Sequence, residues 1–269
     1  MKIKIFCTSI EPYLLLNKLP SYIQPLGLGE KNYPSNWLKE KKGENIKNLN
    51  KYYGELTGFF WVWKNLSEQF NNDDYVGFCH YRKFWLNYFK NHKSFSINSI
   101  YDDLFNPQDH SFKHIDVIQA QPIIFNKKNL LEDFSLVHKS KMLIKSIDFL
   151  DQPIRNNFLD HLSQNTLYPL NMFIVKKKYF IQYCSIIFPW LEKCYEECVK
   201  KNLLTHYNTR LPAFLAERFT SFWFKQYNDK KLLSYARIGK FFLSEKINRF
   251  INPLKLPFTS KIYPTIHNY

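Results

Sequence analysis

The chain has 269 residues, of which 45% are hydrophobic and 18% are aromatic, and its 38 lysines and arginines exceed its 23 acidic residues to give a formal net charge of +15. This composition excludes a disordered or fibrous chain and predicts one large globular domain with a tail. The positive charge indicates an anionic partner, which belongs to one of three classes: a phosphorylated small molecule, a membrane surface or a nucleic acid.

Cysteine usage and hydropathy indicate a cytoplasmic protein. The five cysteines form an odd set without a CxxC pair, and Cys194 and Cys198 lack two further zinc ligands nearby, so we expect free thiols in a reducing compartment. Residues 1–12 have too short an apolar core for a signal peptide, and no run of about 18 apolar residues occurs that could span a membrane.

The chain opens with a predicted strand over residues 3–7. Thr8 and Ser9 follow it, as small hydroxyl residues do at the nucleotide-binding edge of a Rossmann-like sheet, although any strand followed by any turn explains them equally well. Residues 20–42 contain three prolines and little periodicity and are predicted to form a loop. The two glycines in this loop are not a dinucleotide fingerprint, because no third glycine and no helix follow in register.

Residues 43–85 contain the densest set of candidate functional residues. Apolar side chains at helical spacing predict a buried helix over residues 55–66, and the short β-rich run 75–79 predicts a buried strand. The strand is followed at once by the polar sequence His80-Tyr81-Arg82-Lys83. Ligands of open α/β sheets bind just beyond the carboxyl ends of strands, so this junction is the first candidate for a binding site.

The remaining elements alternate in type, which predicts an α/β fold. A strand is expected over residues 115–120 and another over 168–175; helices are expected around 97–105 and over 129–148, 178–202 and 210–227. The segment 225–261 carries nine lysines and arginines against Asp229 and Glu245, interleaved with apolar residues. It predicts a basic amphipathic helix lying on an anionic membrane, or equally a C-terminal helix that packs on the domain. The predicted division is a domain of residues 1–227 and an extension of residues 228–269.

Several ordered blocks of this sequence resemble a bacterial family, the domain-of-unknown-function family 4422 of capsular and exopolysaccharide gene clusters. The resemblance covers roughly residues 2 to 227 and is carried by these blocks: Gly43 to Ile46, Asn50, Tyr53, Glu55 to Thr57, Trp61 to Asn65, Tyr75 to Gly77, Cys79 to Arg82, Tyr168 to Ile174, Leu215 to Arg218 and Trp223. It implies a GT-A-like, Rossmann-like nucleotide-sugar-binding domain. Relatives in this family transfer galactofuranose or related hexoses from nucleotide donors to surface polysaccharides.

Sugar transfer from such a donor requires stabilisation of the negative charge that develops on the departing diphosphate. Arg82 and Lys83 are predicted to supply this stabilisation. The family has a second arginine where this chain has Lys83; lysine keeps the positive charge but lacks the planar guanidinium group that binds phosphate with two hydrogen bonds. No Asp-x-Asp motif follows the strand, so a divalent metal (Mn²⁺ or Mg²⁺) would be unnecessary, although the sequence leaves metal dependence open. The alternative is structural: Arg82 pairs with Asp74, and Tyr81 packs against the core.

Two glutamates are candidate general bases for the acceptor hydroxyl. Glu217 is preferred because it lies in an apolar helical run, and Glu55 is second; alternatively, Glu217 holds Arg218 and Glu55 caps its helix. The predicted donor-binding residues are Thr8, Ser9, Asn45, His80, Tyr81, Arg82 and Lys83, and the predicted acceptor-binding residues are Tyr168, Asn171 and Arg218. Turn chemistry explains the asparagines equally well, and no residue is predicted to bind a metal.

The sequence therefore supports a glycosyltransferase at the inner face of the cytoplasmic membrane, using a uridine diphosphate sugar and a glycan or lipid-linked acceptor. Two alternatives remain open. The first is a nucleic-acid-binding protein, disfavoured because most aromatic residues fall at core spacings and no recognised motif occurs. The second is a catalytically inactive assembly subunit of a polysaccharide synthesis complex. The sequence does not indicate the oligomeric state.

Overall fold

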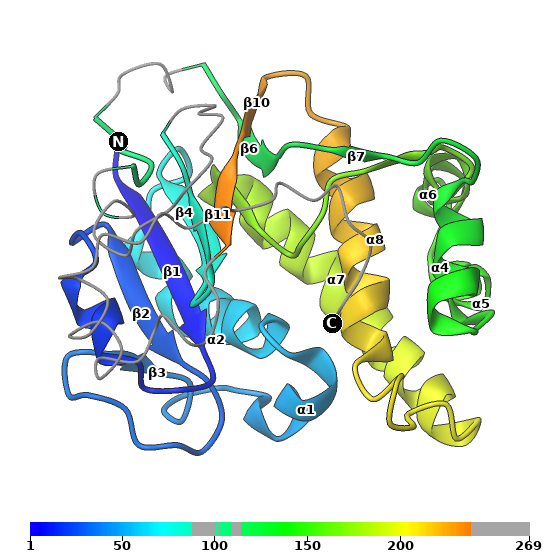
Figure 1. Ribbon diagram of the computed structural model, residues 1–269, viewed down its shortest axis with the longest axis horizontal. Coiled ribbons are helices and arrows are strands. Elements are labelled where there is room, and N and C mark those ends of the chain that lie inside the picture. The colour runs from blue at the N-terminus through cyan, green and yellow to red at the C-terminus, as the bar shows by residue number, and fades with distance from the viewer. Residues whose placement is uncertain (88–100, 102, 109–113, 238–269) are drawn as a thin grey trace, which may run out of the picture.

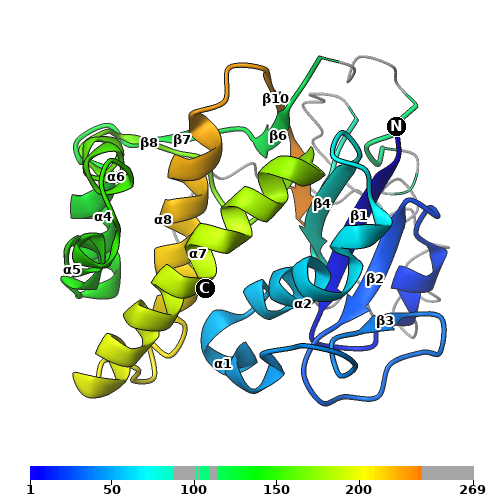
Figure 2. The same cartoon turned by 180° about the vertical axis from the view of Figure 1, so that it is seen from behind.

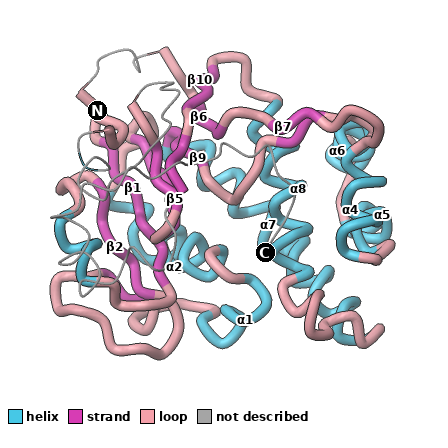
Figure 3. Tube along the Cα trace, viewed as in Figure 1, coloured by secondary structure: helices cyan, strands magenta, loops and turns pink. Residues whose placement is uncertain are grey.

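The computed structural model describes residues 1–87, 101, 103–108 and 114–237. A mixed β-sheet forms one side of the molecule and helices form the other, as Figures 1 and 3 show. The expected α/β fold is confirmed. Within the described residues, no helix is both long enough and apolar enough to cross a bilayer.

The sheet contains nine strands in the described part of the chain, and seven of them follow one another in the order β10-β6-β9-β4-β1-β2-β3. β1 (Ile3–Ser9) runs parallel to both of its neighbours, β2 (Ile23–Gly27) and β4 (Tyr75–His80). The other strands are β3 (Leu38–Lys39), β5 (Lys83–Trp85), β6 (Val117–Ala120), β9 (Phe173–Lys176), β10 (Lys230–Leu233) and β11 (Tyr235–Arg237); β7 (Ile123–Ile124) and β8 (Thr166–Leu167) form a separate pair. Because β1 and β4 are parallel and adjacent, their carboxyl ends meet at one edge of the sheet.

Two long helices separate the sheet from a smaller helical unit (Figures 1 and 2). They are α7 (Lys177–Lys200) and α8 (Leu211–Lys225), and the smaller unit consists of α4 (Leu130–His138), α5 (Met142–Ser146) and α6 (Ile154–Leu162). α2 (Leu56–Leu66) packs on the sheet through Phe59, which contacts Phe78 of β4, and α1 (Asn50–Tyr53) precedes it and packs against α8. Short 3₁₀ helices span Leu14–Lys18, Lys47–Leu49, Ser67–Gln69 and Ile147–Phe149.

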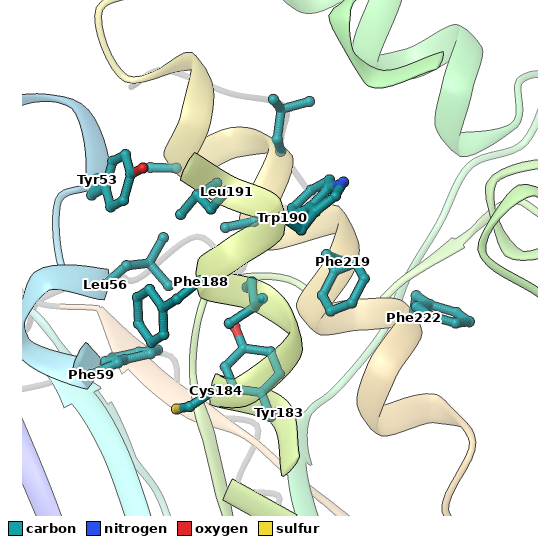
Figure 4. Packing of buried hydrophobic residues seen from close by; sticks show 14 of the residues in the cluster. Tyr53, Leu56, Phe59, Tyr183, Cys184, Phe188, Trp190, Leu191, Phe219 and Phe222 are labelled. Carbon is teal, nitrogen blue, oxygen red and sulfur yellow. The ribbon is translucent and has the colours of Figure 1, made fainter. Parts of the chain in front are cut away.

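The core lies on both faces of the sheet. Along β4, Val76 and Phe78 join the cluster beneath the helices, whereas Tyr75 and Cys79 join the cluster on the opposite face. This alternation is the two-residue period of a strand, and burial on both faces explains the continuous apolar run in the sequence. Figure 4 shows how α7 joins the layers: Phe188 points toward Leu56 and Phe59 of α2, and Trp190 lies beside Phe219 of α8.

Most of the predicted elements are present, but the loop expected over residues 20–42 is wrong. It contains β2, which lies inside the sheet between β1 and β3, and β3 itself. Pro25 and Gly27 belong to β2, and these two residue types usually argue against an inner strand. β2 forms because its pairing with β1 outweighs a weak local preference.

The amphipathic helix expected from residue 225 is also wrong over residues 230–237. These residues form β10, which pairs in parallel with β6, and β11, which pairs with β5. The sheet thus extends beyond the predicted boundary at residue 227. Residues 238–269 and most of the helix expected at 97–105 lie outside the described residues, so the membrane-binding extension stays a prediction. All five cysteines are free and buried.

Candidate active site

A cavity of about 330 Å³ opens at the joint carboxyl ends of β1 and β4. Thr8 and His80 face each other there in the strand register, and the Tyr81–Lys83 turn continues the wall. The opposite wall comes from the α1–α2 junction and from α8. The lining residues are Thr8, Ile10, Leu28, Asn50, Lys51, Gly54, Glu55, His80, Tyr81, Arg82, Lys83, Leu170, Asn171, Arg210, Ala213, Phe214 and Glu217.

Four cationic side chains line this cavity: Lys51, Arg82, Lys83 and Arg210. The Arg82 guanidinium lies 5.3 Å from the centre of the Tyr81 ring, and no described carboxylate forms an ion pair with it. Asp74, the structural partner considered from the sequence, instead accepts hydrogen bonds from the backbone N–H groups of Lys2 and Asn71. Arg82 is therefore available to an anionic ligand as far as the described residues show.

Glu55 is fixed at the base of the cavity by two partners. Its Oε1 accepts a hydrogen bond from Asn171 Nδ2 at 2.8 Å, and its Oε2 lies 2.7 Å from the Arg210 guanidinium. Burial alone would raise the pKa of Glu55, but Arg210, His80 and the Asn171 hydrogen bond together lower it to about 2. Glu55 is thus an ionised group that accepts a proton poorly and holds Arg210 in place.

Glu217 reaches the cavity from α8 and is anchored differently. The Leu170 backbone N–H donates to Oε1 at 2.6 Å, and Arg218 Nη1 donates to Oε2 at 3.1 Å. Arg218 is completely buried and also pairs with Asp133 at 2.8 Å. These contacts hold the Glu217 carboxylate at the cavity wall.

The pKa values of His80 and Lys83 are both lowered. Burial is the main cause for His80; together with the charges of Lys83, Arg210 and Arg82, and against the opposing effect of Glu55, it brings the pKa to about 4. His80 Nδ1 lies 3.1 Å from Thr8 Oγ1, which fixes the ring. Burial likewise lowers the pKa of Lys83, although Glu217 and Glu55 oppose the shift.

The structure brings eight of the twelve predicted site residues together in the cavity: Thr8, Glu55, His80, Tyr81, Arg82, Lys83, Asn171 and Glu217. The other four do not line it. Ser9 is buried and donates to the Glu11 carbonyl, and Asn45 donates to the Gly43 carbonyl within its turn. Tyr168 and Arg218 are buried behind the wall, and Arg218 holds Glu217 in position.

Sequence reasoning did not select two of the four cavity cations, Lys51 and Arg210. Lys51 lies on the one-turn helix α1, and Arg210 directly precedes α8 at the end of a polar loop. Neither position follows a strand, so the strand-end rule could not find them. The local signal of Arg210 is its place directly before a long apolar helix, with no acidic residue next to it in the sequence.

The side chains of the cavity do not fit a divalent metal ion. In the described segments, no three His, Cys, Asp or Glu side chains are grouped to bind one. Both Glu55 oxygens already contact Asn171 and Arg210, and the nearby lysines and arginines would repel a cation.

The fold is similar to that of a solved enzyme structure. The chain superposes on the apo structure of WbbM, a bifunctional glycosyltransferase, with a TM-score of 0.66 and 19% sequence identity; the match covers 89% of this chain and 46% of that one. The chain thus spans about half the length of this structural relative. No curated protein sequence matches it.

A family model matches residues 5–229, which is most of the chain and includes every residue that lines the cavity. The chain belongs to the family described as domain of unknown function (DUF4422).

Proposed function

We propose that this protein is a glycosyltransferase that binds the diphosphate of a nucleotide sugar in the cationic cavity. One observation carries the proposal: four cations, Lys51, Arg82, Lys83 and Arg210, converge at the carboxyl ends of two parallel strands. Ligands of open α/β sheets bind at such strand ends. The likeness to WbbM, described as a bifunctional glycosyltransferase, supports the same conclusion.

The cations would act on the leaving group. Negative charge builds up on the diphosphate as the bond from the sugar to the phosphate oxygen breaks, and fixed positive charges stabilise that transition state more than the ground state. Glu55 keeps Arg210 oriented, because their ion pair is 2.7 Å long and Asn171 fixes the other carboxylate oxygen. The cavity is thus organised before the donor binds, which reduces the ordering cost of binding.

Glu217 is the better candidate for a general base, if the transfer inverts configuration. A base works best when its pKa lies near the working pH, and the pKa of Glu55 is only about 2. Among the described residues lining the cavity, Glu217 is the other carboxylate. Its contacts with the Leu170 N–H and with Arg218 hold the carboxylate at the cavity wall.

We further propose that the transferred sugar is a hexose, galactofuranose or galactose, carried on uridine diphosphate. The acceptor is a lipid-linked glycan or a growing bacterial surface polysaccharide, and the enzyme works as a peripheral protein on the cytoplasmic face of the membrane. The family membership supports this detail, together with the net charge of +15.

Arg82→Ala tests the role assigned to the cations. We expect turnover of a uridine diphosphate sugar, followed as donor hydrolysis or transfer, to fall by about 10²-fold or more, the usual effect of removing one transition-state donor. The melting temperature should change little, because Arg82 is only partly buried and has no described ion pair.

Lys18→Ala serves as the control, since Lys18 is an exposed cation outside the cavity. It removes the same charge and should leave turnover unchanged. Full activity in Arg82→Ala would refute a role of Arg82 in stabilising the diphosphate. An equal loss of turnover in both variants would show that only the net charge of the protein matters.

A further inference from the structure

A second, larger hollow lies on the helical unit, away from the sheet. It has a volume of about 570 Å³ and lies between α5, the 3₁₀ helix Ile147–Phe149, the start of α6 and the C-terminal end of α7. We call it the helical groove and define it by its lining residues: Lys139, Ser140, Lys141, Met142, Ile144, Lys145, Ile147, Asp148, Arg155, Leu159, Lys201 and Leu203. None of these residues has a role in the proposed transfer.

The rim of the helical groove is strongly cationic. Five of its lining residues are lysine or arginine, and Asp148 is the one acidic residue among them. Asp148 is shared between Lys145 and Arg155, and Lys201 pairs with Glu197. Within the described residues, Lys139 and Lys141 form no ion pair. The groove therefore carries a positive charge that the protein does not neutralise.

The helices around the groove expose aliphatic side chains. Ile144 is 39% exposed and Leu159 is 43% exposed, and both line the groove. Leu136 and Val137 on α4 and Val199 near the end of α7 are exposed as well. Half of the ten large exposed hydrophobic residues in the described chain thus lie on these few helices. Figures 1 and 2 show that α4, α5 and α6 form the side of the molecule opposite the sheet.

The helical groove is connected to the cationic cavity by packed side chains. Lys139 of the groove follows His138, whose ring stacks on Phe214 at a centroid distance of 4.4 Å, and Phe214 lines the cavity. The Asn208 side chain fixes His138 by donating to its carbonyl at 2.9 Å.

We propose that the helical groove and its neighbouring aliphatic side chains dock on an anionic phospholipid bilayer. Lysines and arginines around apolar side chains match the interface of such a bilayer, where phosphates lie above acyl chains. A nucleic acid would satisfy the cations but leave the exposed aliphatic side chains without a matching partner. Docking would bring a lipid-linked acceptor to the cavity, and this purpose rests on the proposed function. The docking itself does not depend on it.

Charge reversal tests the docking in the full-length protein. Lys139→Glu combined with Lys141→Glu should reduce cosedimentation with vesicles of phosphatidylcholine and phosphatidylglycerol at least tenfold, because each lysine near an anionic surface contributes roughly fivefold. Lys18→Glu combined with Lys42→Glu is the matched control, since both are exposed, have no ion pair among the described residues and lie outside the groove. An equal loss in both double variants, or no loss in the groove variant, would overturn the proposal.

An uncharged variant keeps the test independent of net charge. Ile144→Gln combined with Leu159→Gln changes two exposed helical positions to a good helix former, so the fold should persist, and vesicle binding should again fall severalfold. The proposal of a bilayer partner would be refuted if the double glutamine variant bound vesicles as the wild type does. It would also be refuted if the variant lost oligonucleotide binding and not vesicle binding. Donor hydrolysis without vesicles should stay normal in all these variants, which separates failure of docking from failure of the proposed transferase activity.

Discussion

Glu55 and Glu217 face the same cavity, but their surroundings give them different chemistry. Glu55 contacts the half-exposed Arg210 and the amide of Asn171, whereas Glu217 contacts a backbone N–H and the buried Arg218. The first arrangement lowers the pKa of Glu55 to about 2, although burial alone would raise it. Two carboxylates of the same type are therefore separated into a fixed anion and a candidate base by their partners.

The low pKa of Glu55 predicts a specific dependence of stability on pH. Its folded pKa of about 2 lies below the ordinary value of 4.5, so its ionised form stabilises the fold above pH 4.5. That contribution is lost as the pH falls from about 4.5 toward 2. We expect Glu55→Gln to lower the free energy of unfolding by about 2 kcal/mol at pH 7, after allowing for the exposure of Arg210.

Urea unfolding of wild type and Glu55→Gln at pH 7, 4 and 3 measures this difference. The two proteins should converge in stability as the pH falls, because wild-type Glu55 becomes protonated on unfolding. Glu68→Gln is the control, since Glu68 is exposed and lies outside the cavity. A stability gap between wild type and Glu55→Gln that stays constant down to pH 3 would show that Arg210 does not lower the pKa of Glu55.

At the scale of elements, the sequence predicts what local patterns determine. The buried strand β4 and the helices α2, α7 and α8 were predicted because each repeats its apolar residues over many positions. β2 and β3 were missed because they lie in a segment with three prolines and little periodicity, and β10 and β11 because they lie in a basic stretch whose pattern is typical of an amphipathic helix. In the candidate site too, local sequence patterns identify some residues, and tertiary packing determines the position of the others.

His80, Tyr81 and Arg82 were found because they directly follow a recognisable strand, and the structure places all three in the cavity. Arg210 and Lys51 were missed because tertiary packing alone brings the ends of α8 and α1 to that strand end. Arg218 was misplaced for a related reason. Its position next to Glu217 in the helix does not show that its side chain turns away from the cavity, toward Asp133.

The junction between α1 and α2 gives a prediction about Arg210. Gly54 has a φ of +57° and a ψ of −128°, a conformation that non-glycine residues adopt only with strain. A β-carbon at Gly54 would also lie 2.0 Å from an Arg210 guanidinium nitrogen. We expect Gly54→Ala to displace Arg210 and to weaken binding of a uridine diphosphate sugar about tenfold or more, as loss of a charged contact does.

Gly29→Ala separates displacement from backbone strain. Gly29 has a φ of +73°, but a β-carbon there would meet nothing within 4 Å. Both alanine variants should therefore lose about 1–3 kcal/mol of stability through strain. Donor affinity, measured by calorimetry, should fall in Gly54→Ala and stay near the wild-type value in Gly29→Ala. Equal affinities in the two variants would mean that the position of Arg210 does not matter for the donor.

Across the whole molecule, the aromatic residues and the positive charge serve different purposes. Most large aromatic side chains lie in the two core clusters, where they join helices to the sheet. The cavity is lined by the aromatic side chains Tyr81 and Phe214 only, among the residues described there. Single-strand binding proteins instead present successive rings along a basic groove. Nine lysines and arginines line the cavity or the helical groove, which suits a compact anion and an anionic surface.

This distribution predicts which anions stabilise the fold. A ligand at 100 times its dissociation constant adds about 2.7 kcal/mol to the free energy of unfolding. That gain corresponds to a rise in melting temperature of roughly 5–10 °C for a protein of this size. We expect uridine diphosphate to produce such a rise and uridine to produce almost none, since the proposed role of the cavity cations is to bind phosphate oxygens. The rise should shrink as sodium chloride increases from about 0.05 to 0.5 M, because salt screens those contacts.

Arg82→Ala should reduce the rise caused by uridine diphosphate, whereas Lys18→Ala should not. A larger rise with single-stranded oligonucleotides than with uridine diphosphate, lost at high salt, would instead identify a nucleic-acid-binding protein.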